Sequence, residues 1–172
     1  MRPEVFGQVY RYLASKRVNI EHDICFHNYA NAKNLQMTYH VGEDFFDITD
    51  GLRAIDEVLL FCNFRRGNRL GHALALGISP EKYYSMKGYK VVLSKQILLD
   101  DIAWIYCKSG KLGCLLEEKL KAELIEKYTS LYKEIYENNI RNGPCPSIHE
   151  YYQSWKLRGD NPQSYRLDEK EF

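Results

Sequence analysis

Residues 35–74 read LQMTYHVGEDFFDITDGLRAIDEVLLFCNFRRGNRLGHAL, and their pattern predicts most of the architecture. Leu35–His40 is rich in residues that favour β-strands, and it stops close to a glycine. From Thr49 or Asp50 onward, apolar residues recur at intervals of three and four, which predicts a helix. Residues 69–74 are short, apolar and preceded by a turn, which predicts a second strand. The order strand, helix, strand predicts a βαβ crossover with a parallel sheet.

The remainder of the chain is predicted to be mainly helical. Residues 17–34 have little regular period, which favours an irregular connection. The other elements that we expect are helices over 5–16, 81–85, 98–106, 116–135 and 149–156, and a third strand over 89–94. We therefore divide the chain into residues 1–95, an α/β segment, and residues 96–172, a helical segment with an irregular tail.

Composition excludes several classes of partner. The chain has 172 residues, enough for one domain or for part of a (β/α)8 barrel, which needs roughly 250. Lys and Arg number 24 and Asp and Glu 23, so no global field attracts nucleic acid or an anionic membrane. We expect neither as a partner, although Arg65, Arg66 and Arg69 cluster.

The sequence also predicts a location. Apolar runs are far shorter than the roughly 20 residues that cross a bilayer, and the first residues have no apolar signal core. The five cysteines form no Cys-x-x-Cys pair, and their odd number argues against a disulfide framework. We expect reduced thiols and a cytoplasmic protein.

Three polar residues fall at the predicted strand ends. His40 and Glu43 follow the first strand, and His72 lies in the second. Side chains at the carboxyl ends of parallel strands converge on one edge, where such folds place their active sites. Two imidazoles and a carboxylate can bind a divalent metal and move a proton. The alternative is that each histidine is a hydrogen-bonded structural residue, which is the commoner role of a lone histidine.

Two motifs in this region resemble those of the adenosine deaminase family. Thr38-Tyr39-His40-Val41-Gly42-Glu43 is similar to the family's His-Ala-Gly-Glu strand. Asn68-Arg69-Leu70-Gly71-His72-Ala73 is similar to its Arg-Ile/Leu-Gly-His-Gly strand, in family order and with a family-like separation. The match covers residues 34–80. It implies a zinc-dependent (β/α)8 barrel of the amidohydrolase superfamily, so the fold that we expect is α/β, a partial barrel followed by a helical insertion or extension.

The resemblance also implies residue roles. The histidine that matches His40 is a metal ligand, and the glutamate that matches Glu43 protonates the purine ring nitrogen. The histidine that matches His72 activates and orients the attacking water, and the glycine that matches Gly42 lies against the purine. The implied reaction is hydrolytic deamination of a 6-aminopurine nucleoside or nucleotide, with zinc or another divalent metal as cofactor.

The sequence departs from the family pattern. Val41 and Ala73 replace a small alanine and a glycine, and the family's His-x-His metal ligands have no counterpart. Asp100-Asp101 is the only Asp pair after His72, but its helical context favours a solvated or capping pair over a metal ligand. His22, His27 and His149 are further imidazoles that we consider less suited as ligands.

Two functions therefore remain open. The first is a fragment of an adenosine deaminase-like hydrolase, inactive alone and completed by the rest of the barrel or by another chain. The helical part after residue 95 resembles insertions of large bacterial deaminase-like proteins, some of which act in antiphage defence. The second is a non-catalytic, degenerate barrel module for protein assembly, in which the stripe from Leu116 to Ile135 packs on another chain. Both predict an oligomer.

Overall fold

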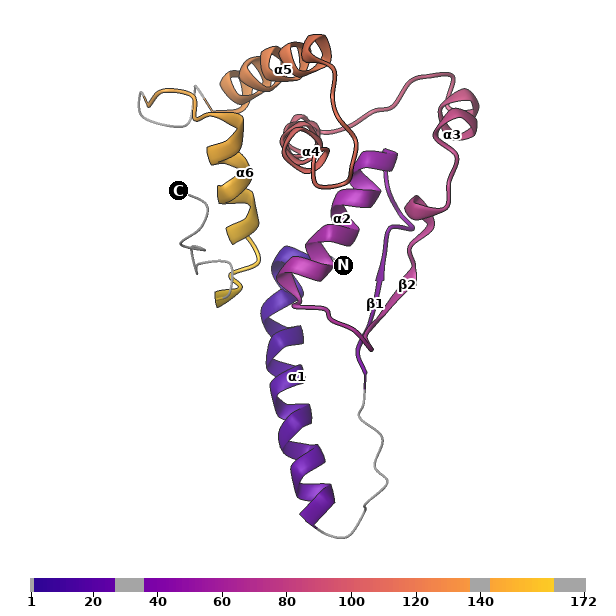
Figure 1. Cartoon of the computed structure of the whole chain (residues 1–172), viewed down its shortest axis with the longest axis vertical. Helices are drawn as coiled ribbons and strands as arrows, with labels where there is room; N and C mark the ends of the chain where they lie inside the picture. Colours follow the sequence, from indigo (N-terminus) through magenta and orange to yellow (C-terminus); the bar gives the residue numbers. More distant parts are fainter. Residues whose placement is uncertain (1, 27–35, 137–142, 163–172) are drawn as a thin grey trace.

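The computed structural model describes residues 2–26, 36–136 and 143–162, with side chains described from residue 36 onward and before residue 16. Figure 1 shows the arrangement of the elements. In chain order they are α1 (Pro3–Phe26), β1 (Thr38–Val41), α2 (Ile48–Phe61), β2 (Arg69–His72), the 3-10 turn η1 (Leu74–Leu76), α3 (Pro80–Met86), α4 (Lys95–Lys108), α5 (Glu118–Tyr136) and α6 (Ile148–Leu157).

The predicted βαβ unit is confirmed. β1 and β2 pair in parallel, from Thr38 opposite Arg69 to Val41 opposite His72. Exposed and buried residues alternate along β1, because one face of the sheet packs against α2 and the other does not. The core between α2 and the sheet consists of Tyr39, Val41, Ile55, Val58, Cys62, Phe64 and Ala75.

The prediction of a partial (β/α)8 barrel is wrong. Within the described ranges the sheet has only β1 and β2, and helices dominate the rest. The predicted third strand over 89–94 is absent; these residues form an open connection from α3 to α4 (Figure 1). Tyr89 has a left-handed backbone, with φ 55°, and the Val92 side chain is 89% exposed. A strand requires a neighbouring backbone to share its hydrogen bonds, and this segment has none beside it in the sheet.

The first helix is longer than the apolar pattern predicts. α1 continues to Phe26, so the prediction of an irregular connection is wrong for residues 17–26. Residues 27–35 lie outside the described ranges. Apolar periodicity predicts a helix only where apolar residues recur along one face, and residues 17–26 lack this pattern.

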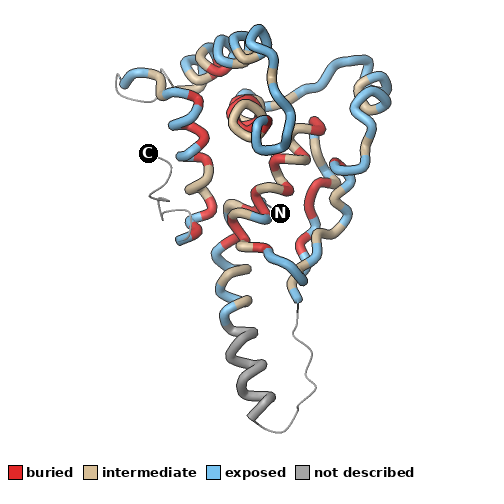
Figure 2. Tube along the Cα trace, viewed as in Figure 1, coloured by how far each residue is buried: buried red, intermediate tan, exposed pale blue. Residues whose placement is uncertain are grey.

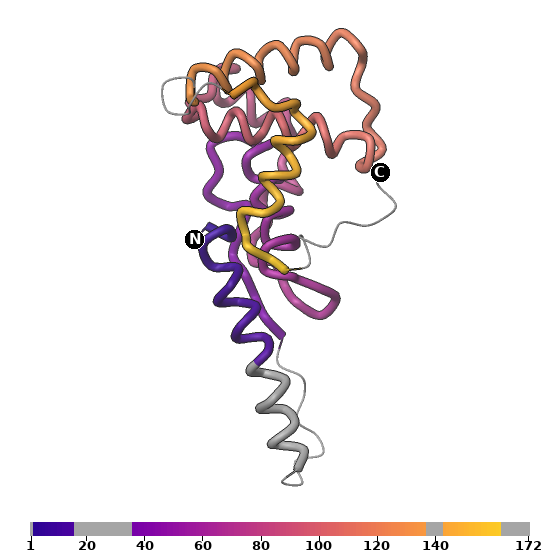
Figure 3. Tube along the Cα trace, turned by 90° about the vertical axis from the view of Figure 1, so that its left-hand side faces the viewer, coloured from indigo at the N-terminus to yellow at the C-terminus, as the bar shows by residue number. Residues whose placement is uncertain are grey.

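Helices α4, α5 and α6 pack together at the other end of the molecule (Figures 1 and 3). Figure 2 shows buried residues on the inner faces of α4 and α6. Serine caps begin two of these helices: Ser94 accepts from the Ile97 N–H, and Ser147 forms a capping box with Glu150. The core of this bundle is formed by Leu99, Ile102, Ala103, Tyr128, Leu131, Ile148 and Tyr151.

A third apolar cluster joins the two halves. Phe61 of α2 packs with Trp104 of α4 and with Tyr152 and Trp155 of α6. Residues from before and after position 95 therefore share one cluster, which joins the βαβ unit to the helical bundle. No helix in the described part of the chain is long and apolar enough to cross a membrane.

Candidate metal centre

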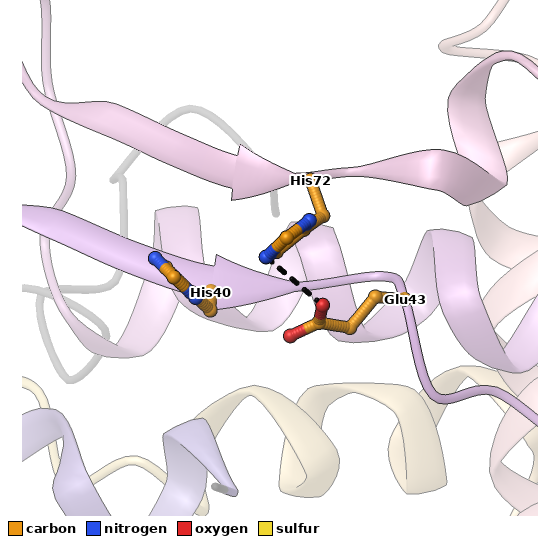
Figure 4. Close-up of side chains that lie close together, drawn as sticks. All are labelled: His40, Glu43 and His72. Carbon is orange, nitrogen blue, oxygen red and sulfur yellow. Dashed lines mark ion pairs between the residues drawn. The ribbon is translucent and has the colours of Figure 1, made fainter.

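The sheet brings His40, Glu43 and His72 to one edge. His40 lies near the end of β1, Glu43 lies just beyond it, and His72 is the last residue of β2. Their metal-binding atoms all lie within 4.8 Å of one another (Figure 4). In the part of the chain that the structure describes, this is the one group of three or more such residues. The predicted convergence of these three side chains is therefore observed.

Contacts between the three side chains define the geometry. His72 Nε2 lies 3.1 Å from Glu43 Oε2. The rings of His40 and His72 meet edge to face, with centroids 4.8 Å apart. The His72 side chain is 47% exposed and that of Glu43 is 31% exposed, so the cluster faces solvent.

Unusual backbone conformations build this edge. His72 and Ala73 have φ angles of 61° and 49°, in the left-handed region that residues other than glycine rarely adopt. Two such residues in succession cost of order 1–3 kcal/mol each and are found mostly at functional sites. Glycine would adopt this conformation at position 73 without strain.

Gly42 turns the chain between His40 and Glu43. Its φ is 70°, and a Cβ atom there would lie 2.8 Å from Ile55 Cδ1, so both conformation and space require glycine. The residue is buried and lines the cleft described below. Its predicted contact with a purine stays a prediction.

The donor set fits a divalent transition metal. Two imidazole nitrogens and a carboxylate oxygen are usual ligands of zinc and of several other divalent metals, so they do not single out zinc. Ligand atoms about 2.0–2.1 Å from a tetrahedral ion lie roughly 3.3 Å from each other. The His72–Glu43 pair has nearly this spacing already. The ligand atom of His40 lies within 4.8 Å of the other two, so the side chains would have to rotate for all three to bind one ion.

A cleft of ≈ 360 Å³ opens beside the cluster. Its lining includes His40 and Glu43, the first residues of α1, residues of α2, the start of α4 and Arg158. Its volume lies in the range of small-molecule sites. The lining includes six carboxylates but three guanidinium groups: Glu4, Glu43, Asp44, Asp50, Glu57 and Asp100 against Arg2, Arg53 and Arg158.

A buried ionic network forms the inner wall of this cleft. Arg53 donates to Asp101 at 2.7 Å, to Asp50 at 2.9 Å and to Glu57. Trp155 also donates to Glu57, at 3.1 Å. One guanidinium thus faces three carboxylates, and Asp101 Oδ2 is buried without a hydrogen-bond partner.

Burial raises the pKa of two of these carboxyl groups. The pKa of Glu57 rises from 4.5 to about 7 because its charged form loses hydration, an effect that Arg53 opposes only in part. The pKa of Asp101 rises from 3.8 to about 7 for the same reason, again opposed by Arg53. The network therefore holds protons near neutral pH.

The Asp100-Asp101 pair lies in this network, so the expectation of a solvated or capping pair is wrong. Asp100 accepts from Arg158 at 2.6 Å and from Tyr151 at 2.6 Å, and both aspartates are buried. The spacing of apolar residues could not predict that this pair is buried. Its charges are neutralised by Arg53 and Arg158, which lie far from it in the sequence. The position of two aspartates among the apolar residues of a predicted helix could have indicated buried charges that need partners.

Of the other candidate imidazoles, only His149 has a described side chain, and it does not join the cluster. The side chains of His22 and His27 lie outside the described part of the structure. His149 lies on α6, where its Nδ1 is 3.5 Å from Cys107 Sγ. Burial raises the pKa of that thiol to about 11, although Lys156 and Lys111 oppose the rise.

Comparisons with known proteins add no relative: no family model and no curated protein matches the chain.

Proposed function

We propose that the chain provides His40, Glu43 and His72 to the active site of a divalent metal-dependent hydrolase that removes the amino group of a 6-aminopurine. The main observation that supports this proposal is that the metal-binding atoms of these three side chains lie within 4.8 Å of one another at the ends of two parallel strands. The two motifs that resemble the adenosine deaminase family supply one metal ligand, one acid and one base.

In this proposal each residue has one task. A bound divalent metal supplies Lewis acidity, which makes water a nucleophile at neutral pH. His40 donates a ring nitrogen as a ligand. His72 accepts a proton from the attacking water, and Glu43 protonates the purine nitrogen beside the carbon under attack. Water adds its oxygen to that carbon, and the amino group leaves as ammonia.

The contact between Glu43 and His72 supports this division. At 3.1 Å, their side chains are within reach for direct proton transfer. A proton taken from water by one group can therefore return to the substrate through the other. Since both side chains are partly exposed, a substrate in the cleft has access to them.

The acidic lining favours a nucleoside over a nucleotide. Six carboxylates outnumber three guanidinium groups, and each guanidinium already has a carboxylate partner in the structure. A phosphate would enter this cleft against net negative charge. Adenosine, which is uncharged, meets no such cost.

The proposal includes further metal ligands from elsewhere, either from another part of the protein or from another chain. The family set contributes His40 alone as a ligand here, and catalytic zinc sites use three protein ligands. We expect little or no turnover by the chain alone. We also propose a reducing, cytoplasmic setting, because Cys62, Cys107 and Cys114 form no disulfide within the described residues.

A non-catalytic assembly module is the second candidate. Leu74, Leu76, Met86 and Val92 expose more than half of their surface between β2 and α4, which favours contact with another chain. The long stripe of α5 contributes less than expected, because Tyr128 and Leu131 are buried in the chain's own bundle. Concentration-dependent association, measured by analytical ultracentrifugation, tests this candidate.

Metal content tests the hydrolase. The chain itself provides the three grouped donor atoms of His40, Glu43 and His72, so after dialysis against Zn²⁺ and then against buffer we expect the wild type to retain more zinc than His40→Ala by elemental analysis. His149→Ala is the matched control, because His149 is an exposed histidine on α6, outside the cluster. Ammonia release from adenosine and from AMP, with added candidate partner chains, tests the reaction. Equal zinc retention by wild type and His40→Ala would refute the proposal.

A further inference from the structure

The rings of His40 and His72 lie together, although two regular strands in this register would place them on opposite faces of the sheet. Along β1, His40 is exposed and its neighbour Val41 is buried against α2. The register pairs His40 with Gly71 and Val41 with His72. Since paired residues lie on the same face of a sheet, a regular β2 would place His72 on the buried face, opposite His40. The left-handed backbone of His72 breaks this alternation, and its ring lies 4.8 Å from that of His40 (Figure 4).

Gly71 leaves the space that the His40 ring occupies. A Cβ atom at position 71 would lie 2.9 Å from both Cγ and Nε2 of His40, and closer still to Cδ2. The backbone of Gly71 does not itself require glycine, because its φ is not among the positive values. The imidazole of His40 is therefore the reason that a side chain does not fit there.

We propose that Gly71 is a positioning residue of the metal centre: its missing side chain lets the His40 imidazole lie across β2, within reach of His72 and Glu43. This inference rests on the proposed function for the metal, but its geometric part stands on the contact between Gly71 and His40. A side chain at position 71 would push the His40 ring away from His72 and Glu43. The cost would appear in metal affinity, because ligand geometry deviates from the ion's preference.

Titration with Co²⁺, followed by its visible absorption, tests the effect on the metal. We expect Gly71→Ala to weaken Co²⁺ binding about 10–100-fold, the usual effect of losing a group that orients a ligand, and to change the absorption spectrum. Gly110→Ala is the matched control, because a Cβ atom there meets nothing within 4 Å. Wild-type affinity and spectrum in Gly71→Ala would overturn the inference.

A double-mutant cycle separates this inference from the proposed function. We expect Gly71→Ala to lower the urea midpoint in the wild-type background and to lower it much less in a His40→Ala background, because the imidazole is then gone. An equal loss in both backgrounds would overturn the role of Gly71. If the wild type alone binds no Co²⁺, the cycle by itself decides whether Gly71 positions His40, because it measures stability and needs no metal.

Discussion

The substitution Glu57→Gln tests whether the buried network holds a proton. Glu57 has a pKa raised from 4.5 to about 7 by burial, so between these values the folded protein keeps a proton that the unfolded chain has lost. Its contribution to stability is therefore complete below pH 4.5 and is lost as the pH rises through 7. One pKa unit corresponds to about 1.36 kcal/mol, so the rise from 4.5 to about 7 changes the stability by at most about 3.4 kcal/mol.

Glutamine resembles the protonated carboxyl group and keeps an oxygen for Arg53 and Trp155, which both donate to Glu57 Oε1. We expect the free energy of unfolding of the wild type to fall between pH 5 and pH 8. Glu57→Gln should match it near pH 5 and exceed it at pH 8 by about 1–3 kcal/mol, because glutamine carries no charge for burial to disfavour.

Urea unfolding at pH 5, 6, 7 and 8, followed by tryptophan fluorescence, measures this slope. Trp155 is a suitable reporter because it is buried and donates directly to Glu57. Glu126→Gln provides the control, since Glu126 is exposed on α5 and should leave the slope unchanged. A wild-type stability that rises from pH 5 to pH 8, or an unchanged slope in Glu57→Gln, would refute the reasoning.

Two further substitutions test the surroundings of the site by urea unfolding. Arg53→Met should destabilise the fold by about 3–5 kcal/mol, because it leaves three carboxylates without their guanidinium partner. The control is Arg65→Met, at an exposed position, which should destabilise the fold by less than about 1 kcal/mol. Ala73→Gly should stabilise the fold by about 0.5 kcal/mol, because the left-handed conformation costs alanine roughly 1–2 kcal/mol and glycine's greater freedom when unfolded offsets part of the gain. A loss of more than about 1 kcal/mol in Ala73→Gly would contradict this account.

Local patterns were sufficient for the elements nearest the site. The apolar spacing around Leu52 and Ile55 predicted α2, and the β-forming run before Gly42 predicted β1. The strand ends then placed His40, Glu43 and His72 on one edge, because parallel strands bring their carboxyl ends together. Each of these predictions requires only the pattern of residues close together in the sequence, or the geometry of one βαβ connection.

Only the tertiary structure decided the rest. A third strand over 89–94 depended on a partner backbone, which the sheet does not provide, and a β-forming sequence cannot report that absence. The orientation of His72 depended on a left-handed backbone that strand alternation does not predict. Arg53 meets Asp101, and Arg158 meets Asp100, only because α2, α4 and α6 pack together. Buried charges require partners, and the partners here are far apart in the sequence, so folding alone determines which groups hold the protons beside the cleft.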